Sequence, residues 1–193
     1  MSIFSAVDDA DDPLRAVKYL ELTAHSGTGM KHYTAAAHAQ RRPRGPVMDL
    51  GCGSGHDLTL FAEAGVAAIG VDPSAVLLSA AADRAATTPL VRALGESLPF
   101  RDASLAGCRI ERVLIHVADP AAVLRDVVRC LQPGALLTVY EPDWSRYRVR
   151  DDPHDDSAAW IAPVNHPAVG SEMWSLIETS GCLVLDRVEE LSV

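Results

Sequence analysis

The sequence predicts an α/β protein with a doubly wound, mostly parallel sheet and helices on both faces. Apolar segments typical of buried strands alternate with segments whose apolar residues recur at helical spacing. A glycine-rich turn, 51–55, follows the first of these strands directly and opens a helical pattern. The chain has 193 residues, of which 48% are hydrophobic and 22% charged, and this balance fits one globular domain with a substantial core.

Residues 1–46 are expected to form an N-terminal helical arm. The acidic residues 1–12 are expected to be frayed, residues 25–29 carry a loop signal, and the Ala-rich residues 30–40 favour a helix. The arm either packs on the domain or forms a lid over the ligand, in which case Tyr19 and Tyr33 are candidate contacts.

Residues 47–193 are expected to form the main domain, within which 141–167 is a polar, Pro- and Asp-rich insertion on the substrate side. Strands are predicted at 47–50, 66–71, 88–91, 106–114 and 135–140, and the tail 182–193 alternates strand residues with charge. Helices are predicted at 58–64, 75–86, 121–131 and 171–180.

Capping residues support these boundaries. Ser74 is placed as an N-cap, and Asp119 precedes a proline suited to the first helical position. Gly65 and Gly181 follow helices, as glycine commonly does, and Gln132-Pro133-Gly134 is expected to end the helix before the fifth strand.

The glycine turn indicates that backbone comes close to a ligand at the N-terminus of a helix. The spacing of Gly51, Gly53 and Gly55 is not that of the dinucleotide fingerprint, because His56 stands where a glycine is needed, and no Gly-Lys-Ser/Thr follows as in a P-loop. Asp72 closes the second strand, where a carboxylate can accept both ribose hydroxyls of an adenosine. The alternative for Asp72 is an ordinary helix-capping role.

Composition argues against several classes of partner. The net charge of −9 is unsuited to nucleic acid or to an anionic membrane surface. The four cysteines are far apart and match neither a zinc site nor a disulfide framework, which favours a cytoplasmic location. No signal peptide or membrane-spanning run is expected, and the bias to Ala, Arg, Asp and Pro is typical of a bacterium with a high-GC genome.

The motifs taken in order resemble those of class I S-adenosylmethionine-dependent methyltransferases over residues 45–145. They are Asp49-x-Gly51-x-Gly53-x-Gly55, Val71-Asp72, Glu96-Ser97-Leu98-Pro99-Phe100, His116-Val117-x-Asp119-Pro120 and Leu131-x-Pro133-Gly134. The resemblance is greatest to the ubiquinone/menaquinone-biosynthesis type that acts on small molecules. It implies a Rossmann-like fold, S-adenosylmethionine as cofactor and S-adenosylhomocysteine as product.

The resemblance also implies roles for individual positions. Asp49 would lie near the amino group of the cofactor's methionine, and Asp72 would hold the ribose. The remaining candidate cofactor-binding positions of this domain are Gly51, Cys52, Gly53, Gly55, Pro73, Gly95, Glu96, Ser97, Glu111 and Arg112, and Tyr19 is added to them as a contact of the expected lid. For Glu111 and Arg112 the alternative is a salt bridge at the end of a strand.

Methyl transfer is an in-line displacement, so the protein mainly aligns the nucleophile and excludes water. His116 is the first candidate for a general base, and a structural histidine at a helix start is its alternative. Glu141 and Asp143 are the next candidates, with a solvated acidic loop as the alternative. Trp144, Tyr147 and Trp160 either line an aromatic substrate pocket or pack as a lid, and no metal site is expected.

The sequence therefore predicts an enzyme that methylates a small-molecule acceptor, such as an aromatic or quinone-like compound, at O, C or N. Two alternatives stay open: a protein of this fold that catalyses a non-methylating step such as a cyclisation, and a non-catalytic subunit. The family normally ends in an antiparallel hairpin, of which the sequence predicts only one strand. Two hypotheses follow: the chain is a truncated or shortened member, or a homodimer covers the C-terminal sheet edge.

Overall fold

The computed structural model of the chain confirms the α/β class. It describes residues 4, 6–24, 28–143, 145 and 164–182. Five strands form one sheet in the order β3-β2-β1-β4-β5, and every pair is parallel. The strands are β1 (Val47–Leu50), β2 (Ala68–Asp72), β3 (Leu90–Arg92), β4 (Leu105–Glu111) and β5 (Leu131–Tyr140).

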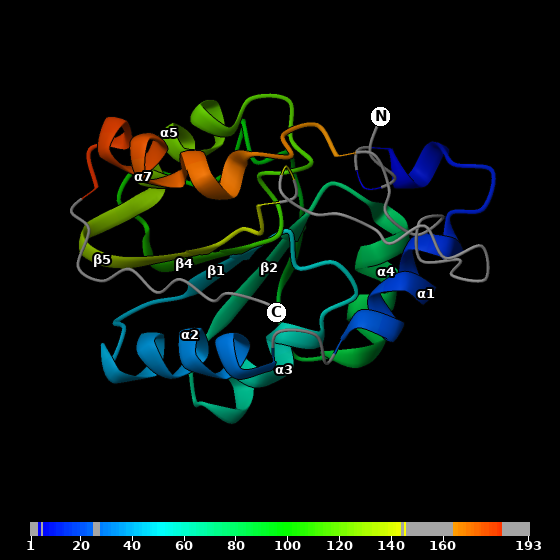
Figure 1. Cartoon of the computed structure of the whole chain (residues 1–193). Helices are drawn as coiled ribbons and strands as arrows, with labels where there is room; N and C mark the ends of the chain where they lie inside the picture. Colours follow the sequence, from blue (N-terminus) through cyan, green and yellow to red (C-terminus); the bar gives the residue numbers. More distant parts are fainter. Residues whose placement is uncertain (1–3, 5, 25–27, 144, 146–163, 183–193) are drawn as a thin grey trace.

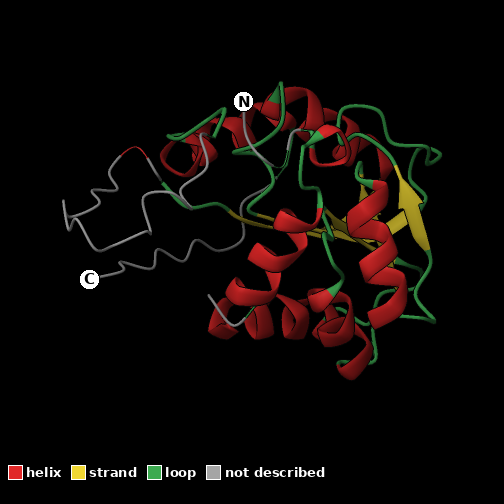
Figure 2. Cartoon of the chain, turned by 90° about the vertical axis from the view of Figure 1, so that its right-hand side faces the viewer, coloured by secondary structure: helices red, strands yellow, loops and turns green. Residues whose placement is uncertain are grey.

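Helices cover both faces of this sheet (Figure 1). The helices α5 (Pro120–Cys130) and α7 (Val169–Ser180) lie on one face, and α2 (Thr28–Gln40) and α3 (His56–Glu63) lie on the other. The helix α4 (Ala75–Arg84) packs on β2 and β3 and carries α1 (Leu14–Thr23). In Figure 2 the strands are seen between two layers of helices.

Successive side chains along β1 and β4 point to opposite faces of the sheet, and this alternation determines which residues contact each layer of helices. Met48, Leu50 and Ile110 pack in the large apolar core beneath α5, while Val47 packs with Phe61 of α3. The same alternation turns Asp49 and its register partner Arg109 toward α2 and α3. Polar residues therefore interrupt these strands on one face only.

The caps form as the sequence predicts. The side chain of Ser74 accepts from the amide of Leu77, and that of Asp119 accepts from the amide of Ala122 with Pro120 at the first helical position. Gly181 ends α7 in the left-handed conformation. The strands predicted between 47 and 140 and the helices predicted from 58 onward are present with shifted ends; β4, for example, ends at Glu111 because Arg112 adopts a φ of 55°.

Three expectations outside the central pattern were wrong. Residues 7–9 form a short 3₁₀ helix, with Val7 buried and Asp8 accepting from the amides of Ala75 and Val76, so the acidic start caps α4 instead of fraying. Of the expected loop at 25–29, Thr28 and Gly29 belong to α2 instead, and 25–27 lie outside the described residues. Gln132-Pro133-Gly134 lies within β5, where the register with β4 is irregular, and does not separate helix from strand.

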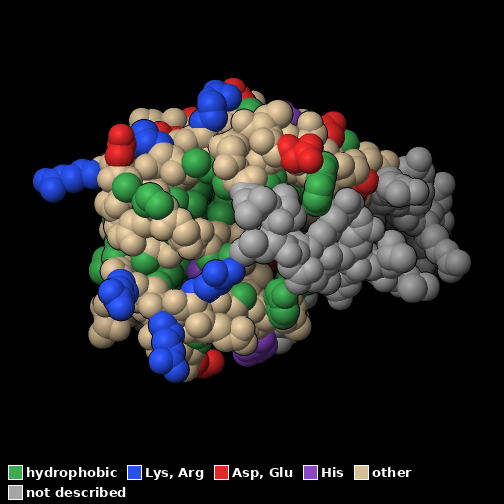
Figure 3. All heavy atoms as spheres, turned by 90° about the vertical axis from the view of Figure 1, so that its left-hand side faces the viewer, with side chains coloured by type: hydrophobic (Ala, Val, Ile, Leu, Met, Phe, Trp, Pro, Cys, Tyr) green, Lys and Arg blue, Asp and Glu red, His purple; other side chains and the backbone are tan. Residues whose placement is uncertain are grey.

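Within the described residues, β5 is the edge strand of the sheet on the side of β4. Figure 3 looks onto this side of the molecule, where hydrophobic side chains are exposed among Lys and Arg side chains. Trp144, most of the insertion at 141–167 and all but the first residue of the tail at 182–193 lie outside the described residues, so the covering subunit stays a prediction. No helix in the described ranges has the length and apolar character needed to cross a bilayer.

The packing of Gly55 gives a first testable prediction. Gly55 precedes α3 with a φ of 79°, and a Cβ there would lie 3.0 Å from the backbone and side chain of Ala81 in α4. Gly65 after α3 also has a positive φ, of 71°, but a Cβ there would meet nothing within 4 Å. Gly65→Ala should cost about 1–2 kcal/mol from backbone strain alone, whereas Gly55→Ala should cost about 3 kcal/mol because overpacking adds to it.

Urea denaturation of both variants measures the two costs. Equal costs would contradict the view that Gly55 lets α3 approach α4.

Candidate cofactor and substrate cavity

A cavity of about 890 Å³ opens at the carboxyl ends of β1, β2 and β4. This is the end of a parallel sheet where α/β folds bind ligands. The cavity brings together most of the predicted site residues: Tyr19, Gly51, Cys52, Gly53, Asp72, Pro73, Gly95, Glu96, Glu111, Arg112 and His116. Asp49, Gly55, Ser97, Glu141 and Asp143 do not line it.

The glycine turn forms the floor of the cavity. The amides of Gly51 and Cys52 both donate to the carbonyl of Val71, which fixes the turn to the end of β2. Gly51 has a φ of 72°, and a Cβ there would lie 2.3 Å from the side chain of Val113. A larger residue is therefore excluded at Gly51 both by the backbone conformation and by the loop after β4. Burial raises the pKa of the Cys52 thiol well above its usual range, so this side chain is an apolar wall.

Asp72 connects the turn to the end of β2. Its Oδ2 accepts from the amide of Gly53 at 3.0 Å, and its Oδ1 accepts from the amide of Ser74 at 2.9 Å. Burial raises the pKa of Asp72 to about 6, against the lowering effect of these two hydrogen bonds. Each carboxylate oxygen has a second lone pair, so Asp72 retains acceptors for hydroxyl groups of a ligand.

The wall beyond β3 is formed by the 94–96 segment. Gly95 is buried against Val123, and the Oε1 of Glu96 accepts from the amide of Ala118 at 3.1 Å. Leu94 is 60% exposed at the edge of the cavity. Ser97 points elsewhere, because it is exposed and does not line the cavity.

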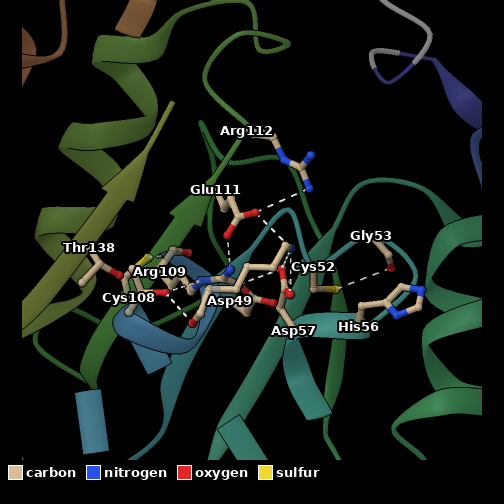
Figure 4. Close-up of polar contacts among 12 residues, drawn as sticks. Asp49, Cys52, Gly53, His56, Asp57, Cys108, Arg109, Glu111, Arg112 and Thr138 are labelled. Carbon is tan, nitrogen blue, oxygen red and sulfur yellow. Dashed lines mark hydrogen bonds and ion pairs between the residues drawn. The ribbon is translucent and has the colours of Figure 1, made fainter. Parts of the chain in front are cut away.

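A buried network of charged side chains lies beside the turn (Figure 4). Arg109 pairs with Asp49 at 3.2 Å, with Asp57 at 3.0 Å and with Glu111. Lys31 of α2 donates to both oxygens of Asp57 and lies 2.9 Å from Oε1 of Glu111. The side chains of Lys31 and Arg109 are only 5% and 2% exposed, so their charges need these carboxylates.

This network changes the expectation for Asp49. Its carboxylate lies under the cavity floor, paired with Arg109, and does not line the cavity. Burial raises the pKa of Asp49, which the Arg109 guanidinium opposes. Asp57 and Glu111 of the same network do line the cavity.

The upper wall is aromatic. The ring of His116 lies 4.9 Å from that of Phe4, which in turn lies 5.7 Å from Tyr19 of α1. Burial, aided by the nearby charge of Arg112, lowers the pKa of His116 to about 4, so its imidazole is neutral at pH 7. Asn165 completes the wall and donates to the carbonyls of His116 and Val117.

Glu141 and Asp143 have local partners. Oε1 of Glu141 accepts from the amides of Val113 and Leu114, each at 2.7 Å, and burial raises the pKa of this carboxyl to about 7. Asp143 accepts from the amide and hydroxyl of Ser145. The structure thus uses Glu141 to hold the loop after β4, behind the cavity wall.

Sequence reasoning missed Lys31, Asp57 and Arg109. The one available signal was the charged residue at 109 within an otherwise apolar strand, because an arginine there must find buried carboxylates. The ion-pair partners could not be found from the sequence because they are far apart along the chain: Lys31 and Asp57 are 26 residues apart, and Arg109 and Asp49 are 60 apart.

Comparisons with known proteins agree with this geometry. Residues 48–139 match the family model described as methyltransferase domain. An uncharacterised methyltransferase of Mycobacterium tuberculosis is 32% identical over 135 residues, which cover 69% of this chain and 52% of that protein. An uncharacterised protein in transposon Tn4556 of Streptomyces fradiae is 38% identical over 135 residues, covering 66% of this chain and 39% of that protein.

Solved structures share the fold. A SAM-dependent methyltransferase from Thermotoga maritima has a TM-score of 0.63 at 21% identity, covering 86% of this chain and 77% of that one. The [4+2]-cyclase SpnF has a TM-score of 0.51 at 25% identity, covering 57% of this chain and 44% of that one. Residues 48–139 are thus similar in sequence to methyltransferase domains, and the chain shares the fold of solved methyltransferase structures. This chain spans about half, or less, of the length of the curated relatives given above.

The two lysines of the chain test the buried network. Lys31→Met leaves Asp57 and Glu111 with one cation fewer, so the variant should lose about 3 kcal/mol of unfolding free energy. Lys18, the other lysine, is exposed on α1, and Lys18→Met should change the stability by less than about 0.5 kcal/mol. Urea denaturation compares the pair, and similar small losses would show that Lys31 is not required by the network.

Proposed function

We propose that this protein transfers a methyl group from S-adenosylmethionine to a small-molecule acceptor. The observation that carries the proposal is one cavity that joins a glycine-rich turn, a carboxylate with spare acceptors and an aromatic wall around a neutral histidine. The glycine turn and Asp72 suit the nucleoside, and the resemblance of the motifs to quinone-pathway methyltransferases points to the same cofactor. When bound, this cofactor supplies an activated methyl group on a sulfonium.

Different residues of the chain would bind the cofactor and exclude water from the acceptor. Asp72 would accept from ribose hydroxyls, and Gly95 with Glu96 would lie beside the base. Phe4 and Tyr19 from the N-terminal residues would help to exclude water from the acceptor end, which is the lid role expected of this arm. Such exclusion favours displacement because the nucleophile loses its hydration shell.

The acceptor end has an apolar lining with few polar groups. Ile115, Val117 and Val164 face the cavity together with the aromatic rings, and the amide of Asn165 is among the neutral polar groups. This lining suits an aromatic or otherwise apolar acceptor better than a phosphorylated one. We propose a quinone- or phenol-like class on this basis.

A second function has support from one observation. The [4+2]-cyclase SpnF shares the fold, so a methyltransferase-type domain also occurs in a protein named for a cyclisation. A pKa of about 4 makes His116 a weak proton acceptor, which a non-methylating step would tolerate more easily. Formation of S-adenosylhomocysteine separates the two functions.

The ionisation of Asp72 predicts how cofactor binding depends on pH. Above pH 6 the carboxylate is ionised and accepts from the ribose, whereas protonation below its pKa of about 6 removes an acceptor. The affinity for S-adenosylhomocysteine should therefore fall as the pH falls below 6, by up to about tenfold per unit. Asp72→Asn should bind weakly at every pH without this inflection.

Isothermal titration from pH 5 to 8 measures both proteins. If the inflection near pH 6 persists in Asp72→Asn, it arises from the titration of another group. That result would contradict the proposed contact between Asp72 and the ribose.

Turnover tests the proposed function and the role of His116. The protein is incubated with S-adenosylmethionine and a panel of phenols, hydroquinones and amines, and S-adenosylhomocysteine is quantified. We expect turnover with at least one phenolic acceptor, and a loss of about 10²-fold in His116→Gln if the imidazole takes the proton. Affinity for S-adenosylhomocysteine should be unchanged in this variant.

Full turnover in His116→Gln would contradict the assignment of the base. Absence of any thermal stabilisation by S-adenosylmethionine at high excess would contradict the proposed function itself.

A further inference from the structure

Arg112 occupies a strained position at the cavity wall. Its φ of 55° lies in the left-handed region, which a residue with a side chain adopts at a cost. The amide of Arg112 donates to the carbonyl of Tyr140, which holds this conformation next to the end of β4. Strain of this kind collects at functional sites, because selection for stability alone favours glycine there.

The charge of Arg112 is only loosely satisfied within the described residues. The ion pair that it makes there is to Oε1 of Glu111 at 3.4 Å. The same oxygen lies 2.9 Å from Lys31, and the other oxygen of Glu111 binds Arg109. Glu111 thus serves three cations, and the 26% exposed guanidinium of Arg112 keeps donors that face the cavity.

Figure 4 shows Arg112 on the side of Glu111 that is turned away from Arg109. The next residue, Val113, packs on Gly51 of the glycine turn, and the charge of Arg112 is felt at His116. Arg112 therefore lies between the turn and the acceptor end of the cavity.

We propose that Arg112 binds a carboxylate of a ligand in this cavity. A guanidinium presents a planar pair of donors that matches a carboxylate in two parallel hydrogen bonds. The inference rests on the proposed function, because the carboxylate belongs either to the amino-acid end of the cofactor or to the acceptor. The balance of charge favours the cofactor: Lys31, Arg109 and Arg112 face Asp49, Asp57 and Glu111, so a zwitterion adds no net charge.

The experiment compares two nucleosides. S-adenosylhomocysteine carries the amino-acid end, and 5′-methylthioadenosine has the same nucleoside and sulfur without it. Isothermal titration measures both ligands on wild type, Arg112→Gln and a control, Arg125→Gln. Arg125 is matched in charge, lies on α5 and is 65% exposed.

If the carboxylate comes from the cofactor, Arg112→Gln should bind S-adenosylhomocysteine about tenfold or more weakly. Its affinity for 5′-methylthioadenosine should be unchanged, and the control should match wild type with both ligands. If the carboxylate comes from the acceptor, S-adenosylhomocysteine should bind normally. Benzoate added to the protein saturated with S-adenosylhomocysteine should then bind wild type and lose about tenfold in Arg112→Gln.

Unchanged affinity of Arg112→Gln for both S-adenosylhomocysteine and benzoate would overturn the inference. Failure of wild type to bind either nucleoside would instead contradict the proposed function, so the two failures are distinguishable.

A glycine variant separates ligand binding from folding. Arg112→Gly relieves the left-handed strain, so its melting temperature should equal or exceed that of wild type. Its affinity for the carboxylate ligand should nevertheless fall as in Arg112→Gln. A lower melting temperature together with unchanged affinity would show that Arg112 serves the fold and would overturn the inference.

Discussion

The guanidinium of Arg109 is the group on which the geometry of the cavity most depends. It lies in the middle of β4 with 2% of its side chain exposed, and an unpaired charge at such a depth would be severely destabilising. Asp49 of β1, Asp57 of α3 and Glu111 of β4 all turn toward it, and Thr34 of α2 accepts from its Nε. One buried charge thus fixes two strands and two helices around the start of the glycine turn.

This arrangement determines which acidic groups are available to a ligand. Asp49 ends up beneath the floor because the register of β1 with β4 places it directly beside Arg109. Asp72 remains in the cavity lining because it lies at the end of β2, where its hydrogen-bond partners are backbone amides and not a buried cation. The cavity therefore has a carboxylate, Asp72, at the end of β2 and a cation, Arg112, at the side of the turn nearest β4.

The alternation of parallel strands with helices and the end of the sheet that carries the cavity were predictable from the sequence, because both follow from local patterns. Apolar segments that alternate with helical segments give parallel strands; Gly51 follows β1 directly, Asp72 ends β2, and Glu96 comes shortly after β3. The role of Gly55 was not predictable, because its contact with Ala81 depends on how two helices pack. Lys31 was missed for the same reason: a lysine on a helix surface becomes a buried ion-pair partner only once α2 docks on α3.

The position of the cofactor is the central claim, and a crystal structure with S-adenosylhomocysteine tests it most directly. The account predicts ribose hydroxyls within hydrogen-bonding distance of Asp72, backbone of 51–53 under the amino-acid end, and the Arg109–Asp49 pair intact beneath it. A ligand whose amino group binds Asp49 after displacing Arg109, or one bound away from Asp72, would contradict it.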